Sequence, residues 1–382
     1  MRLKRLVLPG KFVDAYVYFD FAWLFSKDGV VRAFDLARYC EKRLNGESDA
    51  AVALFSNNQL LPQYQGGREA SALTQLLSSD EAIEVAAPDV DNFSYIFRAG
   101  AGCRSVLDVR FYNRRAFVGA DNGIQQFLAL GREDLQVREI GFSASANLRH
   151  QRVSDLPARQ IRGRLGAVAA ACGPAGGVVG FGAATDDPNW RITFKPFAER
   201  CFGIELNQHA VSCIAGSTAV ERYGVSGQKV QQQPTRGVFR DDEQDSVELT
   251  DVKGRDFELQ DAKINRRIAD LPGANRTFLF KDTLWVLADD GFYYFRLAQN
   301  DERPVSRFVK MTKPPERVLS ASGSKAGIIV ESDDQVFVLN QNIWRTLLSE
   351  PVHSVRGYPS SKRFQHLITA VTRDRVELTA IL

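Results

Sequence analysis

The sequence predicts an all-β protein on three observations. Polar turns separate short apolar segments, as in "FSKDGVVRAF" (25–34), where Asp28-Gly29 stands at the centre. Asp-Gly and Asn-Gly pairs favour the positive φ angles that a two-residue hairpin turn requires. The pattern recurs, and several copies are about 40 to 45 residues apart. Aromatic residues, 10% of the chain, stand mostly on alternating segments such as "YVYFDFAWLF" (16–25), which is typical of packed strands.

Seven hairpins are predicted from this pattern. Each has an apolar approach, a tight polar turn and an outgoing strand that ends in an apolar or aromatic residue. Besides 25–34, the hairpins lie at 118–127, 286–295, 330–339, 370–379 and 214–223, and one with a looser Gly-Pro turn lies at 168–181. Their turn centres lie near positions 28, 121, 175, 217, 289, 333 and 374.

The spacing of the turns indicates a β-propeller. Propeller blades of four strands repeat about every 40 to 45 residues, which is the distance between the last three turn centres. From position 374 to the C-terminus and on from Met1 to position 28 there are 36 residues, about one further blade. The segment 4–8 would join the two strands that end the chain. We therefore predict a seven-bladed propeller closed by pairing of the N- and C-terminal strands. Six or eight blades, a β-sandwich or another all-β fold are the alternatives.

The hairpin motifs carry a family resemblance. "SKDGVVRAFDLARY" (26–39) resembles the end of a WD40 repeat, in which an Asp-Gly turn leads to a strand that finishes with an aromatic residue and Asp. The chain has no Gly-His dipeptide, and Phe34-Asp35 is its nearest match to the Trp-Asp strand end. The resemblance covers about a quarter of the chain. It implies a propeller architecture, not membership of that family.

One propeller domain is predicted over residues 1–382, with two insertions. The first, at about 41–95, is expected to be partly helical. The segments 33–46 and 67–86 favour helices, and in the second Ala70, Leu73, Leu76 and Leu77 fall on one helical face. The apolar stretch "AAVALFSNNQLL" (50–61) between them is expected to form another hairpin.

The second insertion is predicted at 227–263. This segment is polar, with a run of glutamines and an acidic patch at 241–245. Such composition is typical of an exposed loop that is partly disordered. Loops carry function more often than cores do, so both insertions are candidate binding elements.

Composition argues for a globular protein without a strongly charged partner. Hydrophobic residues make up 44% and charged residues 25% of 382 residues, and the formal net charge is +3. A charge this close to zero gives no electrostatic reason to expect a nucleic acid or a membrane. Of the 49 basic residues 36 are arginine. A GC-rich, bacterial genome explains that bias; selection for bidentate anion recognition is the alternative.

Cysteine usage and hydropathy predict a cytoplasmic protein. The five cysteines (Cys40, Cys103, Cys172, Cys201 and Cys213) are odd in number, widely spaced and without a CxxC motif. This pattern argues against a disulfide framework and a zinc site, and favours a reducing compartment. The start, "MRLKRLVLPGKF", has too short an apolar run for a signal peptide. No stretch reaches the roughly 18 apolar residues of a transmembrane helix.

No recognisable motif for catalysis, metal or cofactor binding is found. His150, His209, His353 and His366 form no cluster, and "RHQR" (149–152) favours a solvated loop over an anion site. GxSxG and SxxK are absent, and the glycines of 173–182 suit a turn rather than a phosphate loop. Carboxylate pairs occur at 88–92, 185–190 and 241–245, but "DVDN" lacks the rest of a calcium loop. The sequence therefore assigns no catalytic, cofactor-binding or metal residue, and no cofactor.

Three function classes are compatible with the sequence. The first is a non-catalytic propeller scaffold or recognition subunit that binds a protein or peptide through one face or its insertions. The second is a hydrolase or lyase with its site in the central channel, which inward-facing His, Arg and Asp from several blades would reveal. The third is an accessory subunit of a nucleic-acid-linked defence complex, supported by the arginine bias alone. A small-molecule ligand is compatible with the first two.

Overall fold

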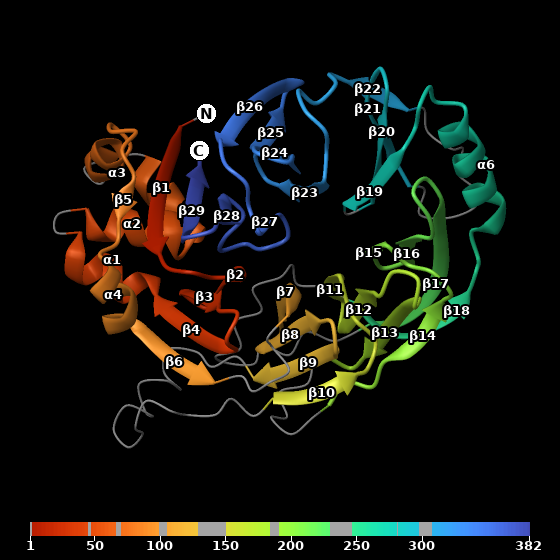
Figure 1. Ribbon diagram of the computed structural model, residues 1–382, viewed down its shortest axis with the longest axis horizontal. Helices are drawn as coiled ribbons and strands as arrows, with labels where there is room; N and C mark the ends of the chain where they lie inside the picture. The colour runs from red at the N-terminus through yellow and green to blue at the C-terminus, as the bar shows by residue number, and fades with distance from the viewer. Residues whose placement is uncertain are drawn as a thin grey trace.

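Seven β-sheets follow one another around a common axis (Figure 1). The computed structural model describes residues 2–44, 47–65, 70–98, 105–128, 150–183, 191–229, 247–280, 282–297 and 308–382. Six of the sheets have four strands and one has five. All the sheets are open, with two edge strands each. The all-β prediction is confirmed, and the layout is propeller-like.

Each sheet contributes one strand to the wall around the axis, and its second strand lies directly outside the first. The inner strands are β2 (Asp14–Tyr18), β7 (Val106–Tyr112), β11 (Gln160–Arg164), β15 (Gly203–Leu206), β19 (Arg276–Phe280), β23 (Ser320–Ser324) and β27 (Ser354–Gly357). The second strands are β3 (Phe21–Phe25), β8 (Arg115–Ala120), β12 (Ala167–Ala171), β16 (Ala210–Ile214), β20 (Thr283–Ala288), β24 (Gly327–Glu331) and β28 (Leu367–Val371).

The third and fourth strands complete each sheet toward the periphery. The third strands are β4 (Val30–Asp35), β9 (Gly123–Leu128), β13 (Gly177–Phe181), β17 (Val220–Lys229), β21 (Gly291–Arg296), β25 (Val336–Asn340) and β29 (Arg375–Ile381). The outer strands are β6 (Ser94–Arg98), β10 (His150–Ser154), β14 (Lys195–Ala198), β18 (Val247–Gly254), β22 (Val309–Met311), β26 (Ile343–Leu348) and β1 (Leu3–Pro9), the last of which is followed by β5 (Ile83–Glu84).

All seven predicted hairpins are present, and each joins the second strand of a sheet to the third. In the hairpin of β3 and β4, Gly29 has a φ of +81°, as the Asp-Gly pair predicted. The Asp28 carboxylate accepts a hydrogen bond from the Val30 amide at 3.1 Å and holds this turn. The recurring sequence motif therefore marks one equivalent position in every sheet.

Hydrophobic clusters fill every interface between neighbouring sheets. The largest spans the sheets of β27–β29, β2–β4 and β7–β9, and the other five clusters each join two neighbouring sheets. At the centre of the largest cluster, Trp23 and Tyr16 each place their ring centroid 5.1 Å from that of Phe111. Packing is thus continuous from each sheet to the next and from the last back to the first.

The two ends of the chain lie in the same sheet. β1 pairs antiparallel with β29 from Leu3 opposite Ile381 to Pro9 opposite Arg375, which is the pairing predicted for segment 4–8. On its other side β1 pairs in parallel with β5. The register with β29 covers all seven residues of β1, whereas β5 covers only Leu6 and Val7 on the other side.

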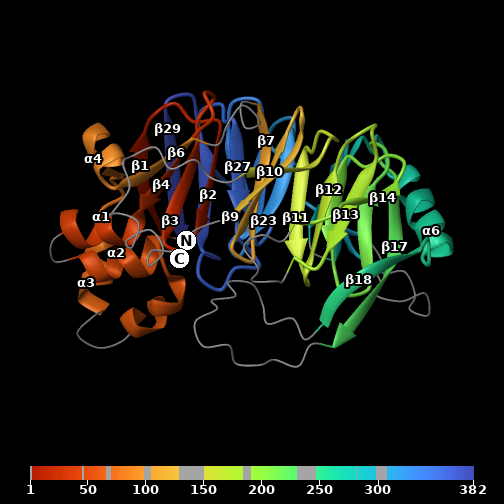
Figure 2. The same cartoon turned by 90° about the horizontal axis from the view of Figure 1, so that it is seen from below.

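The predicted insertion at 41–95 is mainly helical and lies outside the first and last sheets. It contains α1 (Leu36–Arg43), α2 (Ser48–Phe55), the 3₁₀ helix η1 (Asn58–Gln65), α3 (Ala70–Leu76) and α4 (Ala87–Asn92). Figure 2 shows these helices gathered at one side of the ring, opposite α6 (Glu258–Ala269). Among the helices in the described ranges, none combines the length and the apolar character needed to cross a bilayer.

The structure corrects three details of this insertion. The hairpin predicted at 50–61 is wrong, because the segment forms α2 and the start of η1. Alanines favour helix, and a short apolar run has no periodicity that separates helix from strand. The helix at 67–86 is confirmed only over α3, where Leu73 and Leu76 are buried. Asp35, which matched the strand-end Asp of the WD40 resemblance, caps α1 by accepting a hydrogen bond from the Arg38 amide at 2.9 Å.

Much of the segment predicted as a polar loop, 227–263, forms regular secondary structure. β17 continues to Lys229, β18 is the fourth strand of its sheet, and α6 begins at Glu258. The loop prediction is wrong for these residues, since strand and helix can form with little apolar surface when polar side chains pair. The acidic patch at 241–245 lies outside the described residues.

A buried ion pair joins α6 to β17. The Arg222 Nε donates to the Asp261 carboxylate at 2.7 Å, and both side chains are only 1% exposed. The Arg222 amide donates to the other oxygen of Asp261, and the guanidinium also donates to Gln260 and lies 4.4 Å from the ring centroid of Phe257. Polar residues of α6 are therefore part of its packing face.

Candidate functional site

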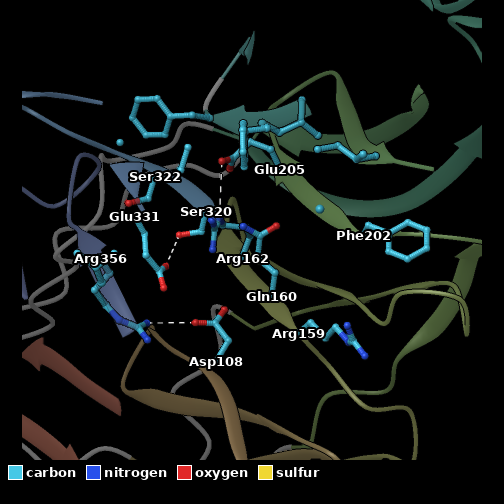
Figure 3. Close-up of a pocket in the computed structure, with 18 of the residues that line it drawn as sticks. Asp108, Arg159, Gln160, Arg162, Phe202, Glu205, Ser320, Ser322, Glu331 and Arg356 are labelled. Atoms are coloured by element: carbon cyan, nitrogen blue, oxygen red, sulfur yellow. Dashed lines mark hydrogen bonds and ion pairs between the residues drawn. The ribbon is translucent and has the colours of Figure 1, made fainter. Parts of the chain in front are cut away.

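A cavity of about 830 Å³ lies on the axis of the ring. Its lining includes residues from the inner strands of all seven sheets, from Tyr16 on β2 to Arg356 on β27 (Figure 3). Residues as far apart in the chain as Tyr16 and Ser360 thus meet at one site. Concave sites with convergent polar groups are where ligands bind most often.

Neighbouring inner strands begin at the same end of the cavity. The Ile161 amide of β11 donates to Asp108 of β7 at 2.7 Å, and the Ile204 amide of β15 donates to Gln160 of β11 at 2.7 Å. The Arg276 guanidinium, at the start of β19, donates to carbonyls just before β23. The starts of β7, β11 and β15 therefore lie side by side at one end of the cavity, and we define residues 107, 159, 160, 200 and 202 there as the entry rim.

The cavity wall carries a surplus of positive charge. Its arginines are Arg110, Arg159, Arg162, Arg164, Arg200, Arg276 and Arg356, and its carboxylates are Asp108, Glu205 and Glu331. Asp14 lies behind the wall and adds one more negative charge beside Arg356. Low-dielectric walls of one dominant sign concentrate the opposite charge, and the guanidinium fork matches carboxylate and phosphate oxygens. Seven of the arginines of the chain thus gather around one cavity.

Arg356 joins three sheets at the cavity wall. Its guanidinium donates to the Asp14 carboxylate of β2 and to the Val109 carbonyl of β7, and it lies 3.3 Å from Asp108 Oδ1. Burial raises the pKa of Asp14, although Arg356 beside it favours the charged form. Burial also opposes the charge on Arg356, but Asp14 and Asp108 raise its pKa above the usual value. This arginine is therefore committed to holding the ring and is not available to a ligand.

Figure 3 shows two further polar pairs at the cavity wall, one between β11 and β15 and one between β23 and β24. Arg162 Nε lies 3.7 Å from Glu205 Oε2 and keeps 24% of its side chain exposed. The Ser320 hydroxyl donates to the Glu331 carboxyl at 2.5 Å. Burial raises the pKa of Glu331 against the opposing effect of that hydrogen bond. Arg162 can still turn toward a ligand, and Glu331 is a carboxyl that retains its proton at higher pH than an exposed glutamate.

The entry rim combines exposed apolar and cationic side chains. Leu107 is 42% and Phe202 is 47% exposed, and both line the cavity. Arg159 and Arg200 are exposed beside them, and neither guanidinium has a hydrogen-bond or ion-pair partner among the residues that the structure describes. Figure 3 shows Arg159 and Phe202 on the same side of the cavity.

The inner strands approach closely at residues beyond the entry rim. A Cβ atom added at Gly357 of β27 would lie 2.4 Å from the Gly323 carbonyl oxygen of β23. A Cβ atom added at Gly323 would in turn lie 2.0 Å from the ring of Phe280. Glycine is required at these positions because no side chain fits between the strands.

The histidines and cysteines singled out from the sequence do not gather at one place. His353 lines the cavity, His209 contacts Gln208 near the start of β16, and His366 is half-buried beside Lys325, where burial first and then the nearby ammonium lower its pKa. The sulfurs of Cys40, Cys172, Cys201 and Cys213 are buried free thiols, whereas Cys103 is outside the described ranges. Within those ranges no group of three His, Cys, Asp or Glu side chains could hold a metal ion.

The remaining motifs take structural roles or lie outside the described ranges. Residues 88–92 form most of α4, so their carboxylates are not arranged as a calcium loop. The glycines of 173–182 include the β12–β13 turn, where Gly173 and Gly176 have positive φ. In "RHQR" the Arg152 guanidinium pairs with Asp155 at 2.7 Å. The carboxylates of 185–190 are not among the described residues.

Sequence reasoning missed the arginines of the cavity. They stand on or beside five inner strands (β7, β11, β15, β19 and β27), and apart from the three at β11 they are dozens of residues apart, so no local motif contains the set. A recurring arginine on the inner strands of several repeats, as at Arg110, Arg162 and Arg276, could have pointed to the cavity. Reading it requires knowing which strand of each repeat faces the axis, and the turn motif marks only the second and third strands.

Comparison with known proteins gives distant structural likeness alone. No family model matches the chain, and no curated protein does. Hsv2 of Kluyveromyces lactis is similar at 12% identity and a TM-score of 0.37, over 70% of this chain and 71% of that one. The N-terminal domain of Nup159 is similar at 8% identity and a TM-score of 0.45, over 99% and 95%.

A computationally designed protein, Ika8, is also similar, at 9% identity and a TM-score of 0.44, over 100% of this chain and 99% of that one. Likeness at this level carries no argument about activity, ligand or partner. Any functional proposal for the chain must therefore rest on its own sheets and cavity.

Proposed function

We propose that the chain is a seven-bladed propeller, closed where β1 pairs with β29, that acts as a non-catalytic recognition subunit for a protein or peptide partner. Its central cavity receives an acidic segment of that partner. The observation that carries the proposal is the surplus of arginine on a wall built from all seven sheets. The buried free thiols support a cytoplasmic location, where thiols stay reduced, and the arginine bias supports a bacterial source.

The charge distribution favours a peptide over a nucleic acid. The net charge of the whole chain is only +3, so the positive charge of the cavity is local. A nucleic acid backbone is usually bound by an extended basic surface. A carboxylate-bearing segment needs only a few guanidinium groups at close range, which Arg162 and the entry rim supply.

A hydrolase or lyase acting in the same cavity is the second candidate function. One observation favours it: the Glu331 carboxyl, which has a raised pKa and faces the cavity, could donate a proton beside bound anions. His353, Asp108 and arginines also line the cavity from several sheets, which is the arrangement expected of a channel enzyme.

Panning a displayed random-peptide library on the purified full-length protein tests the first proposal. We expect acidic peptides to be enriched and their affinity to fall with added salt. Arg162→Gln should weaken binding about tenfold, because a charge-assisted hydrogen bond is lost. Arg373→Gln is the matched control, since Arg373 is exposed and does not line the cavity. Equal binding by both variants would contradict the proposal.

A panel of chromogenic esters, glycosides and phosphates tests the second candidate. If the wild-type protein turns over a substrate, and Glu331→Gln abolishes that turnover without lowering the melting temperature, the protein is an enzyme and the recognition proposal is wrong. Absence of turnover, together with enrichment of acidic peptides, is the outcome expected for a recognition subunit.

A further inference from the structure

The entry rim opens into a second hollow that extends the central cavity outward. This hollow of about 670 Å³ is lined by Leu107 and Arg159, which also line the central cavity, and by Pro157 and Pro174 between the rim and the periphery. The two spaces therefore share a boundary. A ligand that reached from one to the other would pass directly over Leu107 and Arg159.

Leu107 is presented to this passage by a β-bulge. In β7, Val106 is opposite Ala120 and Asp108 is opposite Gly119, so Leu107 has no opposing residue in β8. Bulges of this kind redirect a side chain and occur often beside functional sites. The bulge leaves an apolar side chain 42% exposed at a cavity mouth, where water contact is unfavourable.

Phe202 and Arg159 both lie close to Gly173. A Cβ atom added at Gly173 would contact Arg159 Nε and Phe202 Cε1, each at 3.9 Å. The aromatic ring and the guanidinium thus face one short stretch of passage. Arginine is among the residues in which binding hot spots at protein interfaces are enriched, and so are the aromatic residues tryptophan and tyrosine.

We infer that the entry rim binds an extended peptide in which acidic residues are followed by one large apolar residue. This inference rests on the proposed function and names the class of partner. The acidic residues enter the central cavity and meet Arg162, Arg159 and Arg200, while the apolar side chain packs on Leu107 and Phe202. The rest of the peptide runs outward past Pro157, where Asp121 in the lining disfavours further acidic groups.

Charge complementarity and length both favour an extended peptide as the occupant. The two exposed guanidinium groups at the rim attract carboxylates, and the exposed apolar side chains of Leu107 and Phe202 disfavour a purely charged polymer. A peptide of about ten extended residues spans roughly 33 Å, and such a chain can pass from the central cavity into the hollow that shares Leu107 and Arg159 with it. A single-stranded nucleic acid would satisfy the arginines but would place phosphates beside Asp121.

Fluorescence anisotropy with the full-length protein and three labelled probes tests the inference. The probes are a peptide with a run of aspartates followed by leucine, the same peptide with serine in place of leucine, and a single-stranded DNA oligonucleotide. We expect the aspartate–leucine peptide to bind about tenfold more tightly than the aspartate–serine peptide. Tighter binding of the oligonucleotide than of either peptide would overturn the inference.

Variants separate the rim from the cavity. In Leu107→Ser/Phe202→Ser, both peptides should bind with the weaker affinity of the aspartate–serine peptide. Arg159→Gln/Arg200→Gln should weaken both peptides and reduce their salt dependence. Ile343→Ser, at an exposed apolar residue of β26 that does not line the cavity, is the control and should keep the tenfold preference for leucine.

The outcomes distinguish this inference from the proposed function. If Leu107→Ser/Phe202→Ser keeps the preference for leucine, the inference about the rim is overturned while binding in the cavity stands. If neither peptide binds the wild-type protein, the proposed function fails and this inference with it. Thermal melting of each variant confirms that a loss of binding is not a loss of folding.

Discussion

The Arg356 guanidinium contacts the Asp14 carboxylate across 342 positions of the chain. This pair links the inner strand of the last sheet to that of the first, and Asp108 on the second sheet lies beside it. Tyr358 adds a second link, because its hydroxyl oxygen accepts a hydrogen bond from the Val17 amide nitrogen at 2.9 Å. The ring is therefore joined at its inner wall as well as at its edge, where β1 meets β29.

Replacing Arg356 with methionine should destabilise the protein strongly. The change leaves the Asp14 carboxylate buried without its partner, which typically costs about 3–5 kcal/mol. The free energy of unfolding from urea denaturation measures the loss. Lys310→Met, which removes an exposed ion pair with Asp290, is the control and should leave that free energy unchanged within error. A loss no larger than the control's would show that the pair does not hold the ring.

The Asp261 carboxyl should make stability depend on pH below about 6. Burial raises its folded-state pKa from 3.8 to about 6, and Arg222 opposes that rise. The folded state then binds the proton more tightly than the unfolded state does. The contribution of the protonated carboxyl to the free energy of unfolding is therefore fully present below pH 4 and is lost as the pH rises to 6. The full difference is about 3 kcal/mol.

Asp261→Asn isolates this contribution from other titrations. The difference in free energy of unfolding between wild type and Asp261→Asn, measured by urea denaturation at several pH values, should fall between pH 4 and 6. It should stay constant above pH 7. A difference that rises with pH over this range would mean that the ion pair with Arg222 outweighs burial and lowers the pKa.

Two glycines in equivalent hairpin turns should differ in their tolerance of alanine. In Gly29→Ala the alanine must adopt a positive φ, which should lower the free energy of unfolding by about 1–2 kcal/mol. Gly123→Ala adds a steric conflict, because its Cβ would lie 2.1 Å from the Ser154 carbonyl oxygen of β10. We expect the second loss to be at least twice the first in chemical denaturation. Equal losses would show that β10 shifts easily.

At most one cysteine should react quickly with a thiol reagent in the folded protein. Burial raises the pKa of Cys40 to about 12 and that of Cys172 to about 11. The hydrogen bond with Cys213, and then burial, raise the pKa of Cys201. Thiolate is the reactive form, so these groups should be modified only on unfolding.

Counting modified thiols with a chromogenic disulfide reagent at pH 8, with and without denaturant, checks this expectation. The denatured chain should show all five cysteines. The folded chain should show one at most, Cys103. Rapid labelling of Cys172, identified by peptide mapping, would indicate that the hollow beside it opens in solution.

The sequence alone predicted the sheets better than the helices. Hairpins such as β3–β4 and β20–β21 were recognisable because their Asp-Gly turns act locally. The tight turns between first and second strands were missed, since residues such as Asp20 and Asn113 take positive φ without glycine. α2 was mistaken for a hairpin because its apolar residues are buried on all sides by neighbouring elements.

Local sequence determined the all-β class and the seven hairpins, because turn geometry and alternation act between residues close in the chain. The pairing of the terminal strands was predicted from the spacing of the repeats, because the two ends of the chain together supply the strands of one further sheet. Only the tertiary structure decided that Arg162, Arg159 and Arg200 face one cavity and that Leu107 stands on a bulge at its mouth. Those positions depend on how seven sheets pack around an axis, and that packing is a sum of contacts between distant segments. A cavity lined by all the sheets has no local signature for this physical reason.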